Sequence, residues 1–399
     1  MSTRIGLAVL LAHVHLASYA DDGSKNQPAA AAEVRTDATL GERIAALRLE
    51  FEAREKALSG ELAAAREAGE RGSEARAKKL AEVVESYQRD ERAIFDKVVE
   101  LVRAHPADPA AFEGVLLLRA SFGDDVLEIV RAHFLDDPRM GRLCAFLSER
   151  MSNSSKELLG EVAAKNHDRR IQGQATYAIG LYACNLYDRR IKGRKLTEST
   201  RESTLEEARR SFDKVVKDYP DVTSADGTFR LADKASAELV RIANIPTLKI
   251  GKIAPNVAGE DLDGKPLKLS DYRGKVVVLC FWATWCAPCM AMVPHERELV
   301  KRMEGKPFAL VGVDCDQTED RDKARKTARD EKMSWPSFWD GGINGPIQTR
   351  YNVDSYPTLY VLDAQGVIRF IDVRGKDLDR AVDALLVDLK SGTGVAVRK

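Results

Sequence analysis

The sequence FWATWCAPC occupies residues 281–289 and decides how the C-terminal part of the chain is interpreted. Residues 276–282 form an unbroken apolar run, which is typical of a strand buried on both faces. Residues 290–303 follow with a helical pattern, so Cys286 is predicted to lie where a strand turns into a helix. A thiol there faces unpaired backbone N–H groups, which favour its thiolate. We therefore expect Cys286 to be a nucleophile and Cys289, one turn deeper, to resolve the mixed disulfide.

Further segments of the same region predict an α/β domain. Strands are expected at residues 308–314, 358–362 and 367–372, and helices at residues 320–332 and 378–389. Strand–helix alternation that ends in a hairpin and a helix is typical of a mixed central sheet with helices on both faces. Because the helical pattern of the preceding chain ends at Pro246, this domain is assigned to residues 246–399.

Together with Tyr356-Pro357-Thr358, the motif of residues 281–289 resembles the thioredoxin superfamily, and among its branches the TlpA-like thiol-disulfide oxidoreductases of bacterial envelopes. The resemblance covers about residues 248–390. It implies a thioredoxin-like domain, an enzyme that exchanges disulfides with protein thiols, a partner protein that donates or accepts electrons, and no cofactor. It also implies that Pro357 is cis and faces Cys286. The residues that it places on the substrate side are Trp285, Pro288, Tyr356 and Pro357.

Two positions depart from the pattern of the resembling family. Thioredoxins carry a buried acid six residues before the first active-site cysteine, and this position is Cys280. TlpA-like proteins often carry a glutamate three residues after the second cysteine, and this position is Met292. The usual proton acceptors of the resolving thiol are therefore missing. We expect Glu296, Asp314 or water to replace them.

Three alternatives remain open for the cysteine pair. A C-x-x-C motif can be half of a zinc site, but the chain has no second such motif and His295 is the only histidine nearby, so no metal is expected. A thiol peroxidase of the peroxiredoxin branch would need proline and threonine where the chain has Leu279 and Ala283. A helical interaction protein could use the domain only for docking, although the intact cysteine pair argues against this.

The other cysteines are assigned from their positions in the predicted elements. Cys315 ends the strand beside the one that leads to Cys286, where ligand sites of such sheets lie. A third redox thiol is one interpretation, and a spare surface cysteine is favoured over it. Cys144 and Cys184 lie in predicted helices, where they either form a disulfide or stay buried as thiols.

The N-terminus has the pattern of an export signal. Within residues 1–20, Arg4 precedes an apolar run and Ser18-Tyr19-Ala20 suits cleavage after Ala20, which predicts a periplasmic or cell-envelope protein. Residues 21–36 are small and polar and are expected to be a linker. Lys plus Arg and Asp plus Glu both number 62, so the balanced charge argues against a nucleic-acid partner. No later apolar run has the length of a membrane span.

Residues 37–245 are predicted to form an all-α region with amphipathic helices. Within it, residues 172–243 resemble a tetratricopeptide repeat, with a third helix expected from Ala225 to Ala243. The positions that carry this resemblance are Tyr177, Gly180, Tyr182, Ala208, Phe212, Val215 and Pro220. The turn between the first two helices is longer than in the repeat. A packing scaffold is therefore favoured, and binding of a partner protein is the alternative.

Overall fold

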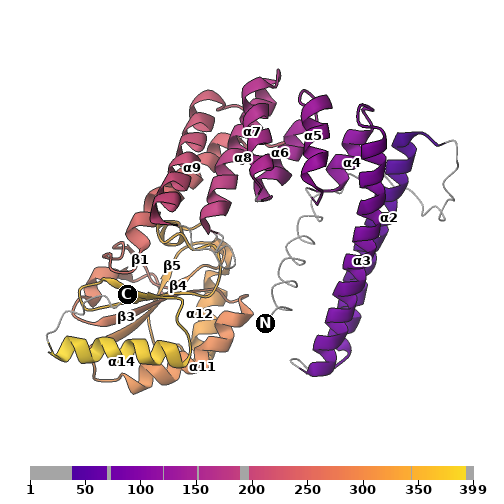
Figure 1. Ribbon diagram of the computed structural model, residues 1–399. Helices are drawn as coiled ribbons and strands as arrows, with labels where there is room; N and C mark the ends of the chain where they lie inside the picture. Colours follow the sequence, from indigo (N-terminus) through magenta and orange to yellow (C-terminus); the bar gives the residue numbers. More distant parts are fainter. Residues whose placement is uncertain are drawn as a thin grey trace. The chain divides into compact units, whose positions relative to one another are not determined.

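The computed structural model describes residues 38–69, 73–119, 121–150, 152–188, 197–342 and 344–391 (Figure 1). The chain forms two compact units that divide between Ser236 and Ala237. The predicted export signal and linker, residues 1–36, lie outside the described residues. None of the helices in the described ranges is long and apolar enough to cross a membrane.

Within the described residues, the first unit consists of helices joined by short connections. These helices are α2 (Leu40–Glu67), α3 (Glu74–Ala104), α4 (Ala111–Leu117), α5 (Asp124–His133), α6 (Met140–Glu149), α7 (Asn153–Lys165), α8 (Arg169–Asp188) and α9 (Glu198–Asp218). Helix α2 begins after Thr39, because Thr39 accepts a hydrogen bond from the backbone N–H of Glu42 and the Glu42 side chain accepts one in return. Helix α3 ends at Ala104, directly before His105-Pro106.

Helices α8 and α9 form an antiparallel pair with close backbone approaches. Gly180 lies against the ring of Phe212, and Gly173 lies against the ring of Tyr219. A Cβ atom on Gly180 would come within 2.5 Å of the Phe212 ring, so only glycine fits there. The predicted third helix is wrong at its start, because α10 runs from Leu231 to Asn244 rather than from Ala225.

The delay of α10 has a local cause in the loop before it. Asp226 accepts hydrogen bonds from the Ser224 and Thr228 hydroxyls and from the Thr228 N–H. Gly227 adopts a φ of 75°, and Thr223 and Arg230 pair as an antiparallel bridge. Side chains that bond the nearby backbone compete with helix, so these residues form a turn instead.

The second unit contains a five-stranded mixed sheet in the order β5-β4-β3-β6-β7. The strands are β3 (Val276–Trp282), β4 (Phe308–Asp314), β5 (Ser337–Trp339), β6 (Thr358–Leu362) and β7 (Ile368–Ile371), and the helices are α11 (Ala287–Arg302), α12 (Arg321–Asp330), α13 (Pro346–Arg350) and α14 (Lys376–Ser391). Strand β3 pairs parallel to β4 and antiparallel to β6. The prediction of a helical region followed by an α/β domain with a mixed sheet is confirmed.

Two hydrophobic layers enclose this sheet. Alternate residues of β3 point to opposite faces: Val276, Val278 and Cys280 pack with Val293 of α11 and Val382 of α14. Figure 1 shows α11 and α14 on this same side of the sheet. Val277, Leu279 and Phe281 belong to the layer on the other face, where the ring centroids of Phe281 and Tyr351, at the end of α13, lie 5.5 Å apart. Strand β3 is buried along its whole length, as its sequence predicts.

A small hairpin and the short strand β5 complete the second unit. Strands β1 (Ala258–Glu260) and β2 (Pro266–Lys268) are antiparallel, and Gly264 between them has a φ of 82°. Strand β5 and helix α13 were not predicted from the sequence. Strand β5 pairs parallel with the end of β4, so it lies next to the strand that ends at Asp314.

Candidate functional site

The two cysteines of the motif form a disulfide at the N-terminus of α11. Cys286 caps the helix, and its Sγ atom accepts a hydrogen bond of 3.1 Å from the backbone N–H of Cys289. Pro288 lies in the first turn of α11, where proline is tolerated because that N–H has no helical partner. A negative charge on Cys286 would face the same N–H groups, as the sequence predicts.

Exposure does not distinguish the two sulfur-bearing residues, since Cys286 is 4% exposed and Cys289 is 3% exposed. The cavities that the two cysteines line do distinguish them. Cys286 lines an open hollow of about 660 Å³, together with Trp285, Pro288 and Tyr356. Cys289 lines a separate inner cavity of about 10 Å³. The hollow is open to the exterior, whereas the inner cavity has about the space of one water molecule.

The open hollow brings together three of the four predicted substrate-side residues, Trp285, Pro288 and Tyr356. Trp285 is 52% exposed, and its ring meets the Tyr356 ring edge-on at a centroid distance of 5.5 Å. The Tyr356–Pro357 peptide bond is cis, so this expectation is confirmed. Pro357 itself lines the inner cavity rather than the hollow. The other walls come from the loop before β6 and from α13, with Asn344, Gln348, Val353, Asp354 and Ser355.

The inner cavity holds a buried carboxyl group beside the Cys289 side chain. Glu296, two turns further along α11, lines this cavity and is 4% exposed. Its Oε1 atom has no hydrogen-bond partner in the structure. Burial raises the pKa of Glu296, and the neighbouring Cys280 thiol lowers it by less. Burial and then the Glu296 carboxylate raise the pKa of Cys280 well above its ordinary value.

Asp314, the second predicted proton acceptor, lies in different surroundings. It ends β4, is fully buried, and is not among the described residues that line the inner cavity. Its Oδ1 atom accepts a hydrogen bond of 3.1 Å from the backbone N–H of Asp316, and its Oδ2 atom has no partner. Burial, followed by the charge of Asp316, raises the pKa of Asp314 to about 8. The geometry therefore favours Glu296 over Asp314 as the acceptor for Cys289.

Sequence reasoning missed the contact between Thr284 and Asp316. The Thr284 N–H and hydroxyl each donate a hydrogen bond of 2.8 Å to the Asp316 carboxylate. The acid is fully buried and follows β4, while Thr284 belongs to the loop after β3. The D-C-D sequence at the carboxyl end of a buried strand was the available signal, because polar groups of such sheets gather there.

The remaining cysteines are buried thiols. The expectation of a surface position for Cys315 is wrong, because its side chain is fully buried. Burial raises the pKa of Cys315, which lowers its reactivity. Cys144 and Cys184 do not form a disulfide with each other. His295 binds Asp379 at 3.1 Å, and the described residues contain no cluster of three or more His, Cys, Asp or Glu side chains suited to a metal ion.

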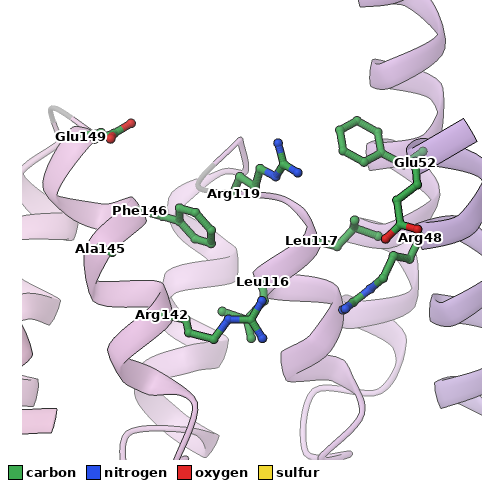
Figure 2. A pocket seen from close by; sticks show the side chains of 10 residues that line it. Arg48, Glu52, Leu116, Leu117, Arg119, Arg142, Ala145, Phe146 and Glu149 are labelled. Carbon is green, nitrogen blue, oxygen red and sulfur yellow. The ribbon is translucent and has the colours of Figure 1, made fainter. Parts of the chain in front are cut away.

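The helical unit carries a hollow of its own, of about 450 Å³ (Figure 2). Its floor is apolar and comes from Phe51, Leu116 and Leu117, all of which are largely buried. Figure 2 shows Arg48 and Glu52 of α2 on one side and Phe146 and Glu149 of α6 on the other. The remaining lining residues are Arg119, Arg142 and Ala145. Apolar floors with polar rims are typical of ligand and peptide sites.

Comparisons with known proteins concern the second unit. Residues 250–371 match the AhpC/TSA family. The thiol-disulfide oxidoreductase ResA of Bacillus thuringiensis subsp. konkukian is 32% identical over 139 residues, which are 35% of this chain and 78% of that protein. The thioredoxin-like protein YneN of Bacillus subtilis is 38% identical over 138 residues, with 33% and 78% covered. The thioredoxin domain of a thiol-disulfide oxidoreductase from Bacteroides vulgatus is 26% identical with a TM-score of 0.32, over 35% of this chain and 98% of that structure.

Proposed function

This chain belongs to the TlpA-like thiol-disulfide oxidoreductases of the thioredoxin superfamily, and we propose that it exchanges disulfides with exported proteins through Cys286 and Cys289. The observation that carries the proposal is the Cys286–Cys289 disulfide at the N-terminus of α11, with Cys286 on an open hollow. Residues 246–399 are the part assigned to this chemistry.

The reaction is a pair of thiol–disulfide exchanges. In the reductive direction, the Cys286 thiolate attacks one sulfur of a substrate disulfide, a new S–S bond forms, and the other substrate sulfur leaves as a thiolate. Cys289 then loses its proton and attacks Cys286 Sγ, which releases the second substrate sulfur. The substrate gains two electrons and the cysteine pair becomes the disulfide seen here. The oxidative direction runs through the same steps in reverse.

The two cavities support the division of roles between the cysteines. A substrate reaches Cys286 from the hollow that contains Trp285 and Tyr356. Cys289 lies on the inner side, where a substrate sulfur has no room beside it because that cavity measures about 10 Å³. Attack from outside on Cys286 and resolution from inside by Cys289 follow from this arrangement.

We assign Glu296 as the proton acceptor of Cys289. The carboxyl group and the Cys289 side chain line the same inner cavity, which also has room for one bridging water. Because burial raises its pKa, Glu296 is closer in pKa to a thiol than an exposed glutamate is. The smaller pKa difference makes proton transfer from Cys289 to Glu296 less unfavourable. Asp314 and bulk water are the weaker candidates for this step.

Trapping of mixed disulfides tests the assigned roles. In Cys289→Ser, Cys286 can attack but nothing resolves the product, so full-length protein should accumulate mixed disulfides with partner proteins. Cys286→Ser should trap none. Equal trapping by the two variants would contradict the assignment. The matching activity measurement is reduction of insulin disulfides, which the wild type should carry out and neither variant should.

A thiol peroxidase is the second candidate, and the match of residues 250–371 to the AhpC/TSA family is the observation in its favour. The position three residues before Cys286, where peroxide sites carry threonine, is Ala283, which is fully buried. Pre-reduced protein should therefore consume hydrogen peroxide no faster than Cys286→Ser does. Consumption that depends on Cys286 and exceeds the rate of insulin reduction would favour the peroxidase.

Export to the periplasm or cell envelope is part of the proposal and rests on residues 1–20. Such a compartment maintains protein disulfides, which are the substrates that the cysteine pair requires. Mass spectrometry of the protein recovered from the periplasmic fraction should give a chain that begins at Asp21. A full-length chain in the cytoplasmic fraction would contradict this part.

The helical unit, with its tetratricopeptide-like pair α8 and α9, is proposed to select the partner protein. Its hollow over Phe51, Leu116 and Leu117 has the size for an apolar side chain of a partner. Ala145→Trp would fill the hollow from an exposed position of α6. In a Cys289→Ser background it should change the set of trapped proteins while insulin reduction by the otherwise wild-type chain stays the same. An unchanged set would leave the unit as a packing scaffold.

A further inference from the structure

The end of β4 and the residues after it carry two buried acids that the proposed exchange reaction does not use. Asp314 ends the strand and Asp316 follows two residues later, and both side chains are fully buried. Buried carboxyl groups are costly unless hydrogen bonds or a proton compensate them. Because both acids lie beside the loop that leads to Cys286, they can determine how that loop is held.

Asp316 attaches this segment to the active-site loop. Its Oδ2 atom accepts from the Thr284 N–H and its Oδ1 atom accepts from the Thr284 hydroxyl, both at 2.8 Å. The backbone N–H of Cys315 also donates to the carbonyl of Trp282 at 2.9 Å. Thr284 directly precedes Trp285, which lines the open hollow with Cys286. Asp316 and the Cys315 N–H therefore hold the chain at Thr284 and Trp282, directly before Trp285.

Asp314 lies next to the Asp316 carboxyl group. Its Oδ1 atom accepts from the Asp316 N–H, while its buried Oδ2 atom has no partner. The titratable groups that face it are Asp316, Asp320, Asp340, Cys315 and Tyr356. Two adjacent buried carboxyl groups cannot both ionise without strong repulsion, so one of them keeps its proton at neutral pH.

We propose that Asp314 and Asp316 are positioning residues for disulfide exchange, with protonated Asp314 beside a carboxylate of Asp316 that holds Thr284 and so orients Trp285 and Cys286. The two carboxyl oxygen atoms of Asp316 each accept a hydrogen bond from Thr284. Ionisation of Asp314 places a second negative charge beside it and loosens the loop. The inference rests on the proposed function only for its effect on rate, since the loop itself responds without a substrate.

The pH range of the effect follows from the surroundings of Asp314. Burial and the Asp316 charge raise the pKa of Asp314 to about 8. Below that pH the pair shares one negative charge and the loop is held. At pH 9, one unit above, only about a tenth of the molecules keep the proton, so the rate of exchange should fall up to about tenfold relative to a protein whose Asp314 cannot ionise.

The test compares wild type with Asp314→Asn, which stays neutral at every pH, in full-length protein. The rate of insulin reduction is measured from pH 6 to 9.5 and expressed as the ratio of variant to wild type, so that titration of the reagents cancels. The ratio should be near one at pH 7 and rise to about ten at pH 9. Asp330→Asn, which removes an exposed acid paired with Lys326 on α12, is the matched control and should give a flat ratio.

A second readout needs no activity. Trp285 emission, obtained as the difference between each protein and its Trp285→Phe variant, should shift between pH 7 and 9 in oxidised wild type and stay constant in oxidised Asp314→Asn. Thr284→Val, which removes the hydroxyl bond to Asp316, should already show the shifted emission at pH 7. A flat ratio together with pH-independent emission in wild type would overturn the inference. Absence of insulin reduction with the emission shift intact would overturn the proposed function instead.

Discussion

Replacement of Glu296 by glutamine tests both the chemistry and the energetics of the inner cavity. The amide keeps the shape of the side chain but cannot accept a proton from Cys289. Glu296 is 4% exposed, its Oε1 atom has no partner, and burial raises its pKa. The wild-type protein therefore keeps a group that is unfavourable for folding. Glu296→Gln should be the slower enzyme and the more stable protein.

The stability change has a definite sign and slope. The pKa of Glu296 is higher in the folded than in the unfolded state, so above about pH 4.3 the unfolded chain releases a proton that the folded protein retains. Wild-type stability therefore falls as pH rises, by about 1.4 kcal/mol per pH unit from this group, until the folded pKa is passed. Glutamine does not titrate. The stability advantage of Glu296→Gln should be small at pH 4 and grow with pH.

The kinetic change concerns the second exchange step alone. A positioned general base contributes about 10²–10⁴-fold to a proton transfer, so resolution of a preformed Cys286 mixed disulfide should slow by about 100-fold or more at pH 7. Formation of that mixed disulfide should be unaffected, because Cys286 lies on the other hollow. Stopped-flow decay between pH 6 and 8 and urea unfolding of the oxidised protein measure the two effects.

Glu298→Gln is the matched control, because Glu298 lies on the exposed face of the same helix. It should change neither the decay nor the pH dependence of stability. If Glu296→Gln decays at the wild-type rate, water already accepts the proton and Glu296 has no part in resolution. If the stability of Glu296→Gln relative to wild type does not increase between pH 4 and 7, burial does not raise the pKa of Glu296.

Three further outcomes are expected. In the reduced protein, iodoacetamide should alkylate Cys286 faster than Cys289, because only Cys286 faces both the helix N-terminus and the open hollow; equal rates by mass spectrometry would contradict the assignment. Met292→Glu should restore fast resolution to Glu296→Gln in the same stopped-flow assay, since Met292 also lines the inner cavity. Gly180→Ala should lower the free energy of unfolding measured in urea, because overpacking against Phe212 costs about 1–3 kcal/mol, whereas helix propensity gains ~1 kcal/mol. Gly160→Ala should raise the free energy of unfolding, because the space around Gly160 is open.

Local sequence patterns predicted the elements that position the cysteine pair. The apolar run of β3 and the turn into α11 are local features, and burial of β3 on both faces follows from its composition. Strand β5 was missed because it has only three residues, Ser337–Trp339, and is defined by pairing with β4. A Cβ at Gly312 of β4 would clash with Ser337 of β5, and no pattern within either segment signals that fit.

The parts of the site that escaped prediction are contacts between distant segments. Thr284 and Asp316 are 32 positions apart, and only the parallel pairing of β3 with β4 brings them together. Burial of Cys315 has the same origin, because it follows β4 directly and its N–H bonds to Trp282 of β3. Sequence spacing indicated that this strand end would carry functional groups, but it could not separate a side chain that reaches the cavity of Cys289 from one that holds the loop.

The same geometry explains how this site can contain an acid although positions 280 and 292, where related families carry one, are Cys280 and Met292. Cys289, Met292 and Glu296 are spaced three and seven residues apart, so they lie on one face of α11. Cys280 of β3 faces that helix and lines the same inner cavity. An acid at any of these positions would therefore lie near Cys289 in the same small cavity. We therefore propose that Glu296 takes the role of the acids that positions 280 and 292 lack, and rescue of Glu296→Gln by Met292→Glu is the outcome that this proposal requires.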